Sequence, residues 1–391
     1  MSLLSDPNSL TIVSILLATW LVMYMIKFTP LYPVLQQLGA SIEYGVLIFR
    51  TSRLNDFLNS FGAKHERIVR ALSSLGVALS FYLLIIGVYT LHVNLLNYFR
   101  RPSQFAPVMP LIPGVTFSVS SLPYFFIAAA TVIIPHELAH AVVASSEHIP
   151  VKSTGVFFLL FLLGAFVEPD ENKLRGSRLT SRLRVFSAGS AINFVLYLLA
   201  VFLLVYMFIP YGIYVMDTLE GYPAAGVLKA DDIIISLNNT STLTLTEFKA
   251  FMDTTKPGDV INVRVIRGGK VLELTLKLAA SPSNATKGFL GVYLSQYYSL
   301  SFAPDVNPSI STMIFKTLQW VELLNISVAV FNMLPIAMLD GGLLLSALLS
   351  NFIEEDKSKI IEKIATLYMV TILLLNMALS FRIPGLQYWV P

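Results

Sequence analysis

The chain has 391 residues, of which 55% are apolar, 13% are charged and none is cysteine. About a quarter of the residues of an ordinary soluble domain are charged, so too few polar side chains are present to cover a water-facing globule of this length. The composition predicts a membrane protein and excludes a disordered chain, a disulfide scaffold and a Cys-ligated zinc or iron–sulfur protein. The net charge of +3 is too small to indicate a nucleic-acid partner.

Apolar blocks recur along the chain at about the length that a helix needs to cross a ~30 Å hydrocarbon core, roughly 20 residues. We predict six spans, near residues 8–28, 73–93, 121–147, 185–209, 312–334 and 361–380. The first block is too long for a cleavable signal peptide, so we expect it to stay as a membrane anchor.

Basic residues predict the orientation of these spans. They cluster between the first and second spans (Arg50, Arg53, Lys64, Arg67, Arg70) and between the third and fourth (Lys152, Lys173, Arg175, Arg178, Arg182, Arg184). Because cytoplasmic loops carry an excess of Lys and Arg, we expect both loops in the cytoplasm. The N-terminus and residues 210–311 are then expected outside.

Two apolar stretches do not fit simple spans. Residues 154–168 are too short for a crossing and contain Gly155 and Gly164, which favours a re-entrant or interfacial element. The run from 312 to about 350 is longer than one crossing and is interrupted by Pro335 and by Gly341-Gly342. It predicts a broken helix, whose unwound backbone must be buried in protein or lie beside a watery cavity.

Residues 212–280 have a different character. Short alternating apolar runs (IYVM, DIIISL, VINVRVI, VLELTLKL) are separated by turn signals such as Pro257-Gly258 and Gly268-Gly269, which is typical of strands in a small soluble β-rich domain. The string GYPAAGVLKADDIIISLNN and the strand pattern after it resemble a PDZ domain of the bacterial and archaeal protease-associated kind. Ala230-Asp231 stands where that family usually has Gly-Asp.

The third span contains the strongest chemical motif, His136-Glu137-Leu138-Ala139-His140. Two imidazoles at i and i+4 lie on one helical face, where they can share one metal ion. This spacing is typical of a catalytic zinc site, in which the adjacent Glu takes a proton from water. The alternative is a hydrogen-bonded cluster in the bundle interior, although ionisable groups at membrane depth are usually functional.

A catalytic zinc ion needs a third protein ligand. Cysteine is absent, and the other histidines lie in loops or at span ends (His65, His92, His148). Asp340 is the only acid between Glu322 and Glu354, in the segment Asn332-Met-Leu-Pro-Ile-Ala-Met-Leu-Asp340-Gly-Gly. It could instead cap a helix at the break, but the need for a third ligand favours a metal-binding role.

The chain resembles the site-2 protease family of intramembrane zinc metalloproteases. The resemblance covers the HExxH helix, the Asn-x-x-Pro-x-x-x-Leu-Asp-Gly segment and a PDZ domain inserted between them. It implies that His136, His140 and Asp340 bind one zinc ion per chain and that Glu137 is the general base. It also implies that the short stretch before Glu168-Pro169 is a membrane-embedded β-hairpin.

Two asparagines are candidates for binding substrate. The family carries a Gly-x-x-x-Asn motif, which Gly189-Ser-Ala-Ile-Asn193 matches with Ser190 where Pro is common. The resemblance makes Asn193 a candidate for holding the substrate backbone or the oxyanion, with an interhelical hydrogen bond as the alternative. Asn332 resembles the family residue that touches substrate, with a helix cap as the alternative.

We therefore expect an α-helical polytopic membrane protein with about six transmembrane helices, an inserted β-rich PDZ-like domain and a short re-entrant β-hairpin. The expected parts are N-terminal helices (1–118), a first catalytic part (119–211), the PDZ-like domain (212–295), a second catalytic part (296–350) and a C-terminal helix (351–391). The expected function is hydrolysis of peptide bonds within or near transmembrane segments. The alternatives are an inactive PDZ-bearing scaffold and a metal-ion transporter.

The expected partners are a transmembrane protein substrate, the lipid bilayer and a peptide or substrate ectodomain at the PDZ-like domain, without nucleic acid. In the family such domains resemble filters or docking surfaces for substrates that another protease has already trimmed. We expect a multi-pass protein of the cell membrane, with the active site towards the cytoplasm and the PDZ-like domain on the other side.

Overall fold

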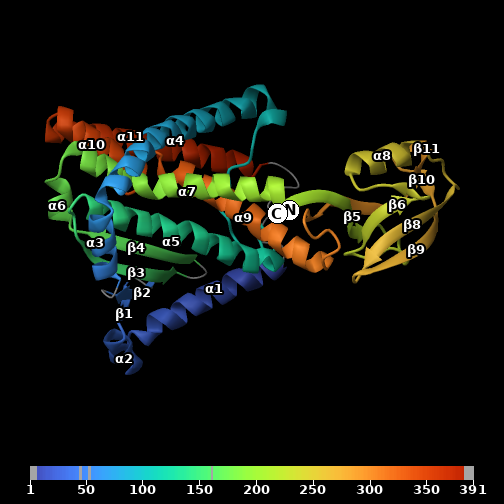
Figure 1. Cartoon of the computed structure of the whole chain (residues 1–391), viewed down its shortest axis with the longest axis horizontal. Coiled ribbons are helices and arrows are strands. Elements are labelled where there is room, and N and C mark those ends of the chain that lie inside the picture. The colour runs from blue at the N-terminus through green and yellow to red at the C-terminus, as the bar shows by residue number, and fades with distance from the viewer. Residues whose placement is uncertain (1–6, 44–45, 52–53, 160–161, 383–391) are drawn as a thin grey trace. The chain divides into compact units, whose positions relative to one another are not determined.

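The computed structural model describes residues 7–43, 46–51, 54–159 and 162–382. Contacts within the chain divide it into two compact units (Figure 1). The first unit comprises residues 1–199 and 320–391, and the second comprises residues 200–319. The second unit is thus inserted into the sequence of the first.

The first unit is mainly helical. Its helices are α1 (Pro7–Ile26), α2 (Leu31–Gln37), α3 (Asn55–Lys64), α4 (Glu66–Arg100), α5 (Leu122–Ser146), α6 (Glu171–Arg175), α10 (Asp340–Phe352) and α11 (Glu355–Ser380), with 3-10 turns η2 (Pro102–Gln104) and η3 (Val119–Ser121). Two long helices, α7 (Leu179–Met207) and α9 (Pro308–Asn332), run from one unit into the other.

Among the described residues, five helices are long and apolar enough to cross a membrane: α4, α5 with its preceding turn, α7, α9 and α11. Within α1, the stretch Leu17–Ile26 forms a shorter apolar helix. The chain is a helical, multi-pass membrane protein, as its composition indicates. The predicted number of six spans stays a prediction.

A four-stranded antiparallel sheet accompanies the helices of the first unit (Figure 1). Its strands, in spatial order, are β1 (Ala40–Glu43), β2 (Val46–Thr51), β3 (Val151–Leu159) and β4 (Leu162–Pro169). The apolar stretch 154–168 is therefore a pair of strands, and its location at membrane depth stays a prediction. Strands β1 and β2 were not predicted from the sequence, and β4 is an edge strand of the described sheet.

Glycines in β3 and β4 make room for aromatic rings on the facing strand. Gly164 is paired with Phe157, and a Cβ on Gly164 would lie 2.0 Å from the Phe157 ring. Gly155 is paired with Phe166 in the same way, with 2.3 Å from a Cβ to the ring. A Cβ on Gly155 would also lie 2.5 Å from the backbone oxygen of Phe49, so this position needs glycine, whereas a side chain at position 164 would require the Phe157 ring to move.

The predicted broken helix is confirmed. Helix α9 ends at Asn332 and α10 begins at Asp340. The intervening backbone lies so close to the first turn of α10 that a Cβ on Gly341 would be 2.1 Å from the Met333 carbonyl oxygen. A Cβ on Gly342 would be 2.1 Å from the carbonyl oxygen of Ile336. The two glycines thus allow the chain to fold back on itself directly beside Asp340.

The second unit contains a β-sheet whose central path is β12-β5-β6-β8-β9, with β7 paired to β6. Its elements are β5 (Phe208–Thr218), β6 (Ile233–Leu237), β7 (Thr240–Ser241), α8 (Leu245–Asp253), β8 (Val260–Arg267), β9 (Lys270–Lys277), β10 (Ala279–Ser281), β11 (Asn284–Phe289) and β12 (Val292–Leu300). The strands predicted from alternating apolar runs are present as β5, β6, β8 and β9. Gly268 and Gly269, both with positive φ, form the two-residue turn between β8 and β9.

The helices that carry the candidate site are held by buried side chains. Trp320 of α9 is fully buried against Phe125 of α5 and Phe117, with ring centroids 5.1–5.7 Å apart. Met333, just after α9, packs with Leu83 of α4 in a second buried cluster. These contacts fix α5 beside α9 and the break that follows it.

Candidate metal centre

Helix α5 places the two histidines of the HExxH motif side by side. His136 and His140 are one helical turn apart, and their rings lie 4.8 Å apart between centroids. Their Nε2 atoms are separated by 3.2 Å. Both nitrogens therefore point into one small space beside the helix.

Asp340 of α10 completes this group from 200 positions further along the chain. Its Oδ2 lies 3.4 Å from Nε2 of His136, and its Oδ1 lies 3.4 Å from Nε2 of His140. The N-cap of α10 is Leu339, without a side-chain capping bond. The Asp340 carboxylate therefore faces the histidines, and it does not cap the helix.

The three side chains fit a four-coordinate zinc ion. Ligand atoms that lie 2.0–2.2 Å from a tetrahedral centre are roughly 3.3–3.6 Å from one another. Here the two Nε2 atoms are 3.2 Å apart, each lies 3.4 Å from a different oxygen of Asp340, and one ligand atom from each residue lies within 4.8 Å of the other two. Space for an ion is kept open by Gly189 of α7, where a Cβ would lie 2.4 Å from Nε2 of both histidines. Two imidazoles and one carboxylate also leave a fourth position free for water.

Glu137 points away from this group, towards the sheet. The backbone N–H of Val167 in β4 donates a 3.0 Å hydrogen bond to Oε2 of Glu137. Because that N–H points to Glu137, it is not used in the pairing of β4 with β3. The candidate base is thus hydrogen-bonded to β4, the edge strand of the sheet in the part of the chain that the structure describes.

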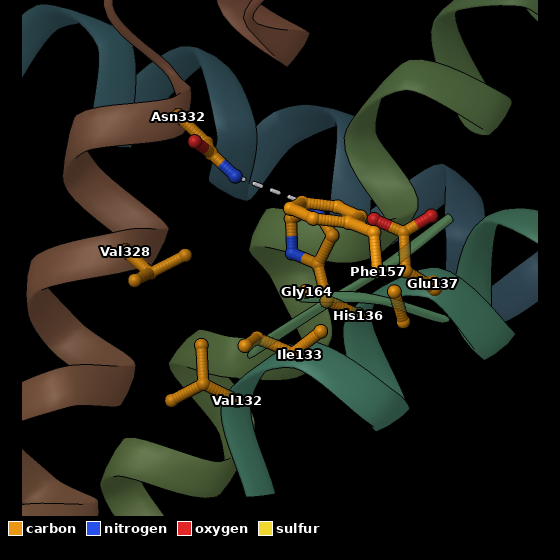
Figure 2. Close-up of a pocket in the computed structure, with 9 residues that line it drawn as sticks. Val132, Ile133, His136, Glu137, Phe157, Gly164, Val328 and Asn332 are labelled. Carbon is orange, nitrogen blue, oxygen red and sulfur yellow. Dashed lines mark hydrogen bonds between the residues drawn. The ribbon is translucent and has the colours of Figure 1, made fainter. Parts of the chain in front are cut away.

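A pocket of about 300 Å³ lies in front of these side chains (Figure 2). Its wall is mostly apolar and comes from α5, from the β3–β4 hairpin and from α9. His136, Glu137 and Asn332 are the polar residues that line it, and Phe157 and Gly164 contribute from the hairpin. A pocket that joins an apolar wall to a few polar groups is typical of a substrate-binding site.

The two candidate substrate-binding asparagines both lie at the histidines. Asn332, at the end of α9, has Nδ2 3.4 Å from Nε2 of His136 and lines the pocket (Figure 2). Asn193 is fully buried, and its side-chain amide makes a 3.1 Å hydrogen bond with Nδ1 of His136. That contact joins α7 to α5, so it is the interhelical hydrogen bond that was the alternative to substrate binding by Asn193. Binding of substrate by either residue stays a prediction.

Helix α7 makes two further contacts with the proposed ligands that were not predicted from the sequence. The carbonyl oxygen of Val185 lies 2.7 Å from Nδ1 of His140, and the Ser190 hydroxyl donates to Oδ2 of Asp340 over 3.2 Å. Ser190 does leave a signal in the sequence, because serine stands where proline is common in the family motif. A backbone carbonyl such as that of Val185 leaves no signal in a sequence.

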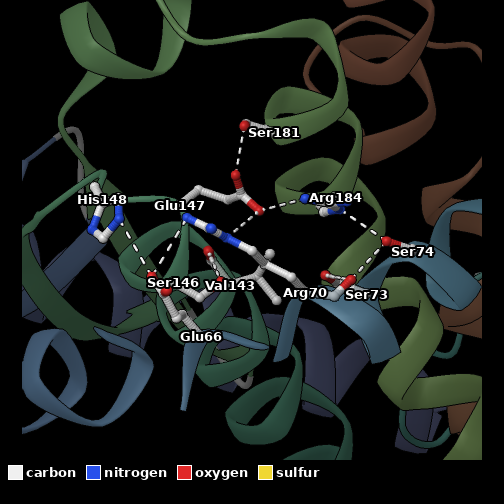
Figure 3. A network of polar contacts seen from close by, with 10 residues as sticks. All are labelled: Glu66, Arg70, Ser73, Ser74, Val143, Ser146, Glu147, His148, Ser181 and Arg184. Carbon is white, nitrogen blue, oxygen red and sulfur yellow. Dashed lines mark hydrogen bonds and ion pairs between the residues drawn. The ribbon is translucent and has the colours of Figure 1, made fainter. Parts of the chain in front are cut away.

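A charged cluster fixes the end of α7 near the site (Figure 3). Glu147, directly after α5, accepts a 2.8 Å hydrogen bond from Arg184 and a 2.5 Å hydrogen bond from the Ser181 hydroxyl. Arg70 of α4 pairs with the same carboxylate at 3.2 Å. Arg184 is next to Val185, so the cluster anchors the segment that contacts His140.

Opposing effects act on the pKa of Glu147. Burial of the carboxylate raises the pKa, whereas the hydrogen bonds from Ser181 and Arg184 and the positive charge of Arg70 lower it. The attractive contacts prevail, and the pKa of Glu147 lies below its usual range. Glu147 is therefore ionised at neutral pH.

Comparisons with known proteins identify relatives of this chain. The sequence profile of peptidase family M50 matches residues 124–376. An uncharacterized protein of Methanocaldococcus jannaschii is 32% identical over 290 residues, which cover 73% of this chain and 69% of that protein. A membrane-bound transcription factor site-2 protease homolog of Arabidopsis thaliana is 27% identical over 201 residues, which cover 48% of this chain and 39% of that protein.

Two solved structures of PDZ domains are similar to part of this chain. The PDZ domain of an SdrC-like protein from Listeria monocytogenes is 28% identical, covers 22% of this chain and 87% of its own, and gives a TM-score of 0.20. The corresponding PDZ domain from Listeria innocua is 30% identical, covers 21% of this chain and 92% of its own, and gives the same TM-score of 0.20.

Proposed function

The chain belongs to peptidase family M50, the site-2 protease family, and we propose that it is an intramembrane zinc metalloprotease. It hydrolyses peptide bonds within or near transmembrane segments of membrane proteins. The observation that carries this proposal is the group formed by His136, His140 and Asp340, whose ligand atoms all lie within 4.8 Å of one another and suit a zinc ion.

Three residues of this chain have distinct roles in the proposed hydrolysis. When bound, zinc acts as a Lewis acid that polarises a peptide carbonyl and makes water a stronger nucleophile. Glu137 accepts the proton of the attacking water and later delivers it to the leaving amine. The Val167 N–H holds one oxygen of Glu137 at 3.0 Å, so the carboxylate keeps its orientation during this transfer. Asn332 lines the pocket in front of His136, where it can hold the substrate backbone.

A transmembrane substrate must unwind locally before its carbonyl groups can react, because a helix keeps them in hydrogen bonds. Addition of the unwound segment to the outer edge of β4 would replace those bonds at edge groups other than the Val167 N–H, which already donates to Glu137. The same edge contacts Glu137, so a segment paired there lies beside the proposed base. Ala165 is two residues before Val167 in β4, so its N–H lies on the same edge of the strand. A proline at Ala165 that left cleavage unchanged would argue against this pairing.

We propose that the active site lies towards the cytoplasm. The HExxH motif is in the second half of α5, and His140 is six residues, or about 9 Å, before the end of that helix. The basic loop between the third and fourth predicted spans follows this end, and such loops are cytoplasmic. Water can then reach the site from that side, with the second unit on the opposite side.

We propose that the second unit selects substrates by size or binds a peptide or the substrate ectodomain. Leu300 at the end of β12 pairs with Phe208 at the start of β5. Removal of residues 209–299 therefore leaves two ends that are already adjacent. If the second unit excludes substrates by size, the shortened protein should cut long, untrimmed substrates. If these substrates remain uncut, the second unit does not act as a size filter.

The experiment that tests the proposed function uses the purified full chain in detergent with a model transmembrane substrate. We expect about one zinc ion per chain in the wild type and in Glu137→Gln, because Glu137 is not a ligand. Only the wild type should cleave, since the variant lacks the base. A protein without zinc would favour the scaffold, and transport of zinc without cleavage would favour the transporter.

A matched control is Glu322→Gln, which makes the same carboxylate-to-amide change in a membrane helix. Glu322 lies in α9 and does not line the pocket. We expect this variant to cleave as the wild type does. Equal cleavage by the wild type and Glu137→Gln would contradict the assignment of the base.

A further inference from the structure

Helix α7 contacts each of the three proposed zinc ligands through an atom that is not itself a ligand. Val185, Gly189 and Asn193 are four residues apart and therefore share one face of the helix. Gly189 leaves the space for the ion, and Ser190 lies directly beside it in sequence. This side of α7 therefore contacts the side chains that form the metal centre.

The first contact fixes the protonation pattern of His140. A backbone carbonyl can only accept a hydrogen bond, and that of Val185 lies 2.7 Å from Nδ1. The proton of the neutral ring is therefore on Nδ1, which leaves the Nε2 lone pair for a metal ion. Residues 181 and 184 are tied to Glu147, which holds this part of α7 in place.

The second contact, made by Asn193, determines which ring nitrogen of His136 carries the proton. Its Nδ1 lies 3.1 Å from the side-chain amide of Asn193, which is fully buried. A half-turn of the amide presents its oxygen to this position, and that oxygen accepts the Nδ1 proton. The Nε2 of His136, which faces Asp340 and His140, is then free to bind a metal ion.

The third contact holds the carboxylate. The Ser190 hydroxyl, also fully buried, donates to Oδ2 of Asp340 over 3.2 Å. This bond restricts rotation of the carboxyl group and stabilises its ionised form. Asp340 is the first residue of α10 after an irregular segment, so its position depends on such external support.

We propose that Ser190 and Asn193 are positioning residues that set the affinity and the geometry of the zinc site by holding Asp340 and His136. This inference rests on the proposed function, because it takes these two residues as zinc ligands. It assigns Asn193 a role behind the ligand, away from the substrate. Such outer contacts typically change metal affinity by about 10-fold to 100-fold.

The test measures the zinc affinity of the full chain in detergent, by competition with a chelator, for Ser190→Ala and Asn193→Ala. Ser187→Ala is the matched control for the serine: Ser187 is in the same helix and fully buried, and its hydroxyl has no hydrogen-bond partner. Asn325→Ala is the control for the asparagine, because this buried amide donates to Val321 of its own helix. We expect the zinc affinity of Ser190→Ala and Asn193→Ala to fall about 10-fold to 100-fold, and the zinc affinity of the two control variants to stay unchanged.

A second measurement separates positioning from a general loss of packing. Cobalt(II) replaces zinc in such sites and reports the ligand geometry in its visible absorption spectrum. We expect Ser190→Ala and Asn193→Ala to change this spectrum, while Ser187→Ala and Asn325→Ala leave it as in the wild type. Thermal unfolding of the metal-free proteins shows whether each variant remains folded.

The outcomes distinguish this inference from the proposed function. If the wild type binds no zinc, the proposed function fails. If the wild type binds zinc and all four variants bind it equally well with the same cobalt spectrum, the positioning role is wrong and the proposed function stands. If Asn193→Ala does not fold, Asn193→Asp replaces it, because the aspartate keeps an oxygen acceptor for His136 Nδ1 and should retain zinc; loss of zinc from a folded Asn193→Asp would contradict the positioning role. If Ser190→Ala does not fold, Ser190→Thr replaces it, because threonine keeps the hydroxyl that donates to Asp340 and should retain zinc affinity.

Discussion

The backbone N–H of Val167 donates a 3.0 Å hydrogen bond to Oε2 of Glu137. This bond connects the proposed catalytic base on α5 with the edge strand β4, where we expect the substrate to pair. The base and the substrate are therefore positioned by the same strand. A displacement of β4 would alter both at once.

Val167→Pro tests this connection, because proline lacks the N–H that Glu137 accepts. The pairing of β4 with β3 should persist, since this N–H points away from β3 and proline is tolerated on edge strands. A hydrogen bond to a charged group contributes about 1.5–3 kcal/mol. We expect cleavage of a model transmembrane substrate to fall roughly 10-fold to 100-fold, with zinc content unchanged.

Val167→Ala is the control for this substitution, because it shortens the side chain and keeps the N–H. It should cleave at close to the wild-type rate. If Val167→Pro and Val167→Ala are equally active, the hydrogen bond does not orient Glu137, and its presence in the resting enzyme has no consequence for the reaction.

The parts of the site that depend on one helix were predictable from the sequence. The i, i+4 spacing of His136 and His140 requires only helical geometry. Asp340 is 200 positions away from His140, and its selection depended on the need for a third ligand and on the family resemblance. The break before it could be anticipated from Pro335 and Gly341-Gly342, because both residue types interrupt helices.

Contacts made by the backbone were not predictable. Every residue has a backbone carbonyl and every residue except proline has a backbone N–H. Only the fold therefore shows that the Val167 N–H faces Glu137 and that the Val185 carbonyl faces His140. Strands β1 and β2 were missed for another reason. They are four and six residues long and lie in a basic loop, where a short strand gives a weak periodic signal.

Gly189→Ala should greatly weaken zinc binding. The added Cβ would lie 2.4 Å from Nε2 of His136 and of His140, in the space that the ion needs. We expect zinc affinity to fall at least about 100-fold, which is more than the loss of one outer contact produces. Metal analysis of the purified protein after dialysis measures this effect.

Gly76→Ala provides the comparison for Gly189→Ala. A Cβ on Gly76 of α4 would approach Cβ of Ala191 in α7 to 3.1 Å, so the two helices must move slightly apart. Overpacking of this kind costs about 1–3 kcal/mol of stability, yet no ligand is touched and zinc should remain bound. Stoichiometric zinc in Gly189→Ala would overturn the assignment of the site.

Glu147→Gln should destabilise the protein at neutral pH. Its ionised carboxylate accepts hydrogen bonds from Ser181 and Arg184 and pairs with Arg70, so the amide loses charge-assisted contacts among three helices. Hydrogen bonds to charged groups contribute about 1.5–3 kcal/mol. We expect a lower thermal unfolding midpoint in detergent at pH 7. Glu171→Gln, in an exposed i, i+4 pair with Arg175, should leave the midpoint unchanged.

The pH dependence of this difference identifies its origin. Because the pKa of Glu147 is lower in the folded protein than in the unfolded chain, its contribution to stability is complete above the unfolded pKa and is lost as the pH falls through the folded value. The gap between wild type and Glu147→Gln should therefore be constant near neutrality and should narrow below about pH 4.5. A gap that persists unchanged in acid would mean that Glu147 acts through packing, and that its charge does not hold the end of α7 beside His140.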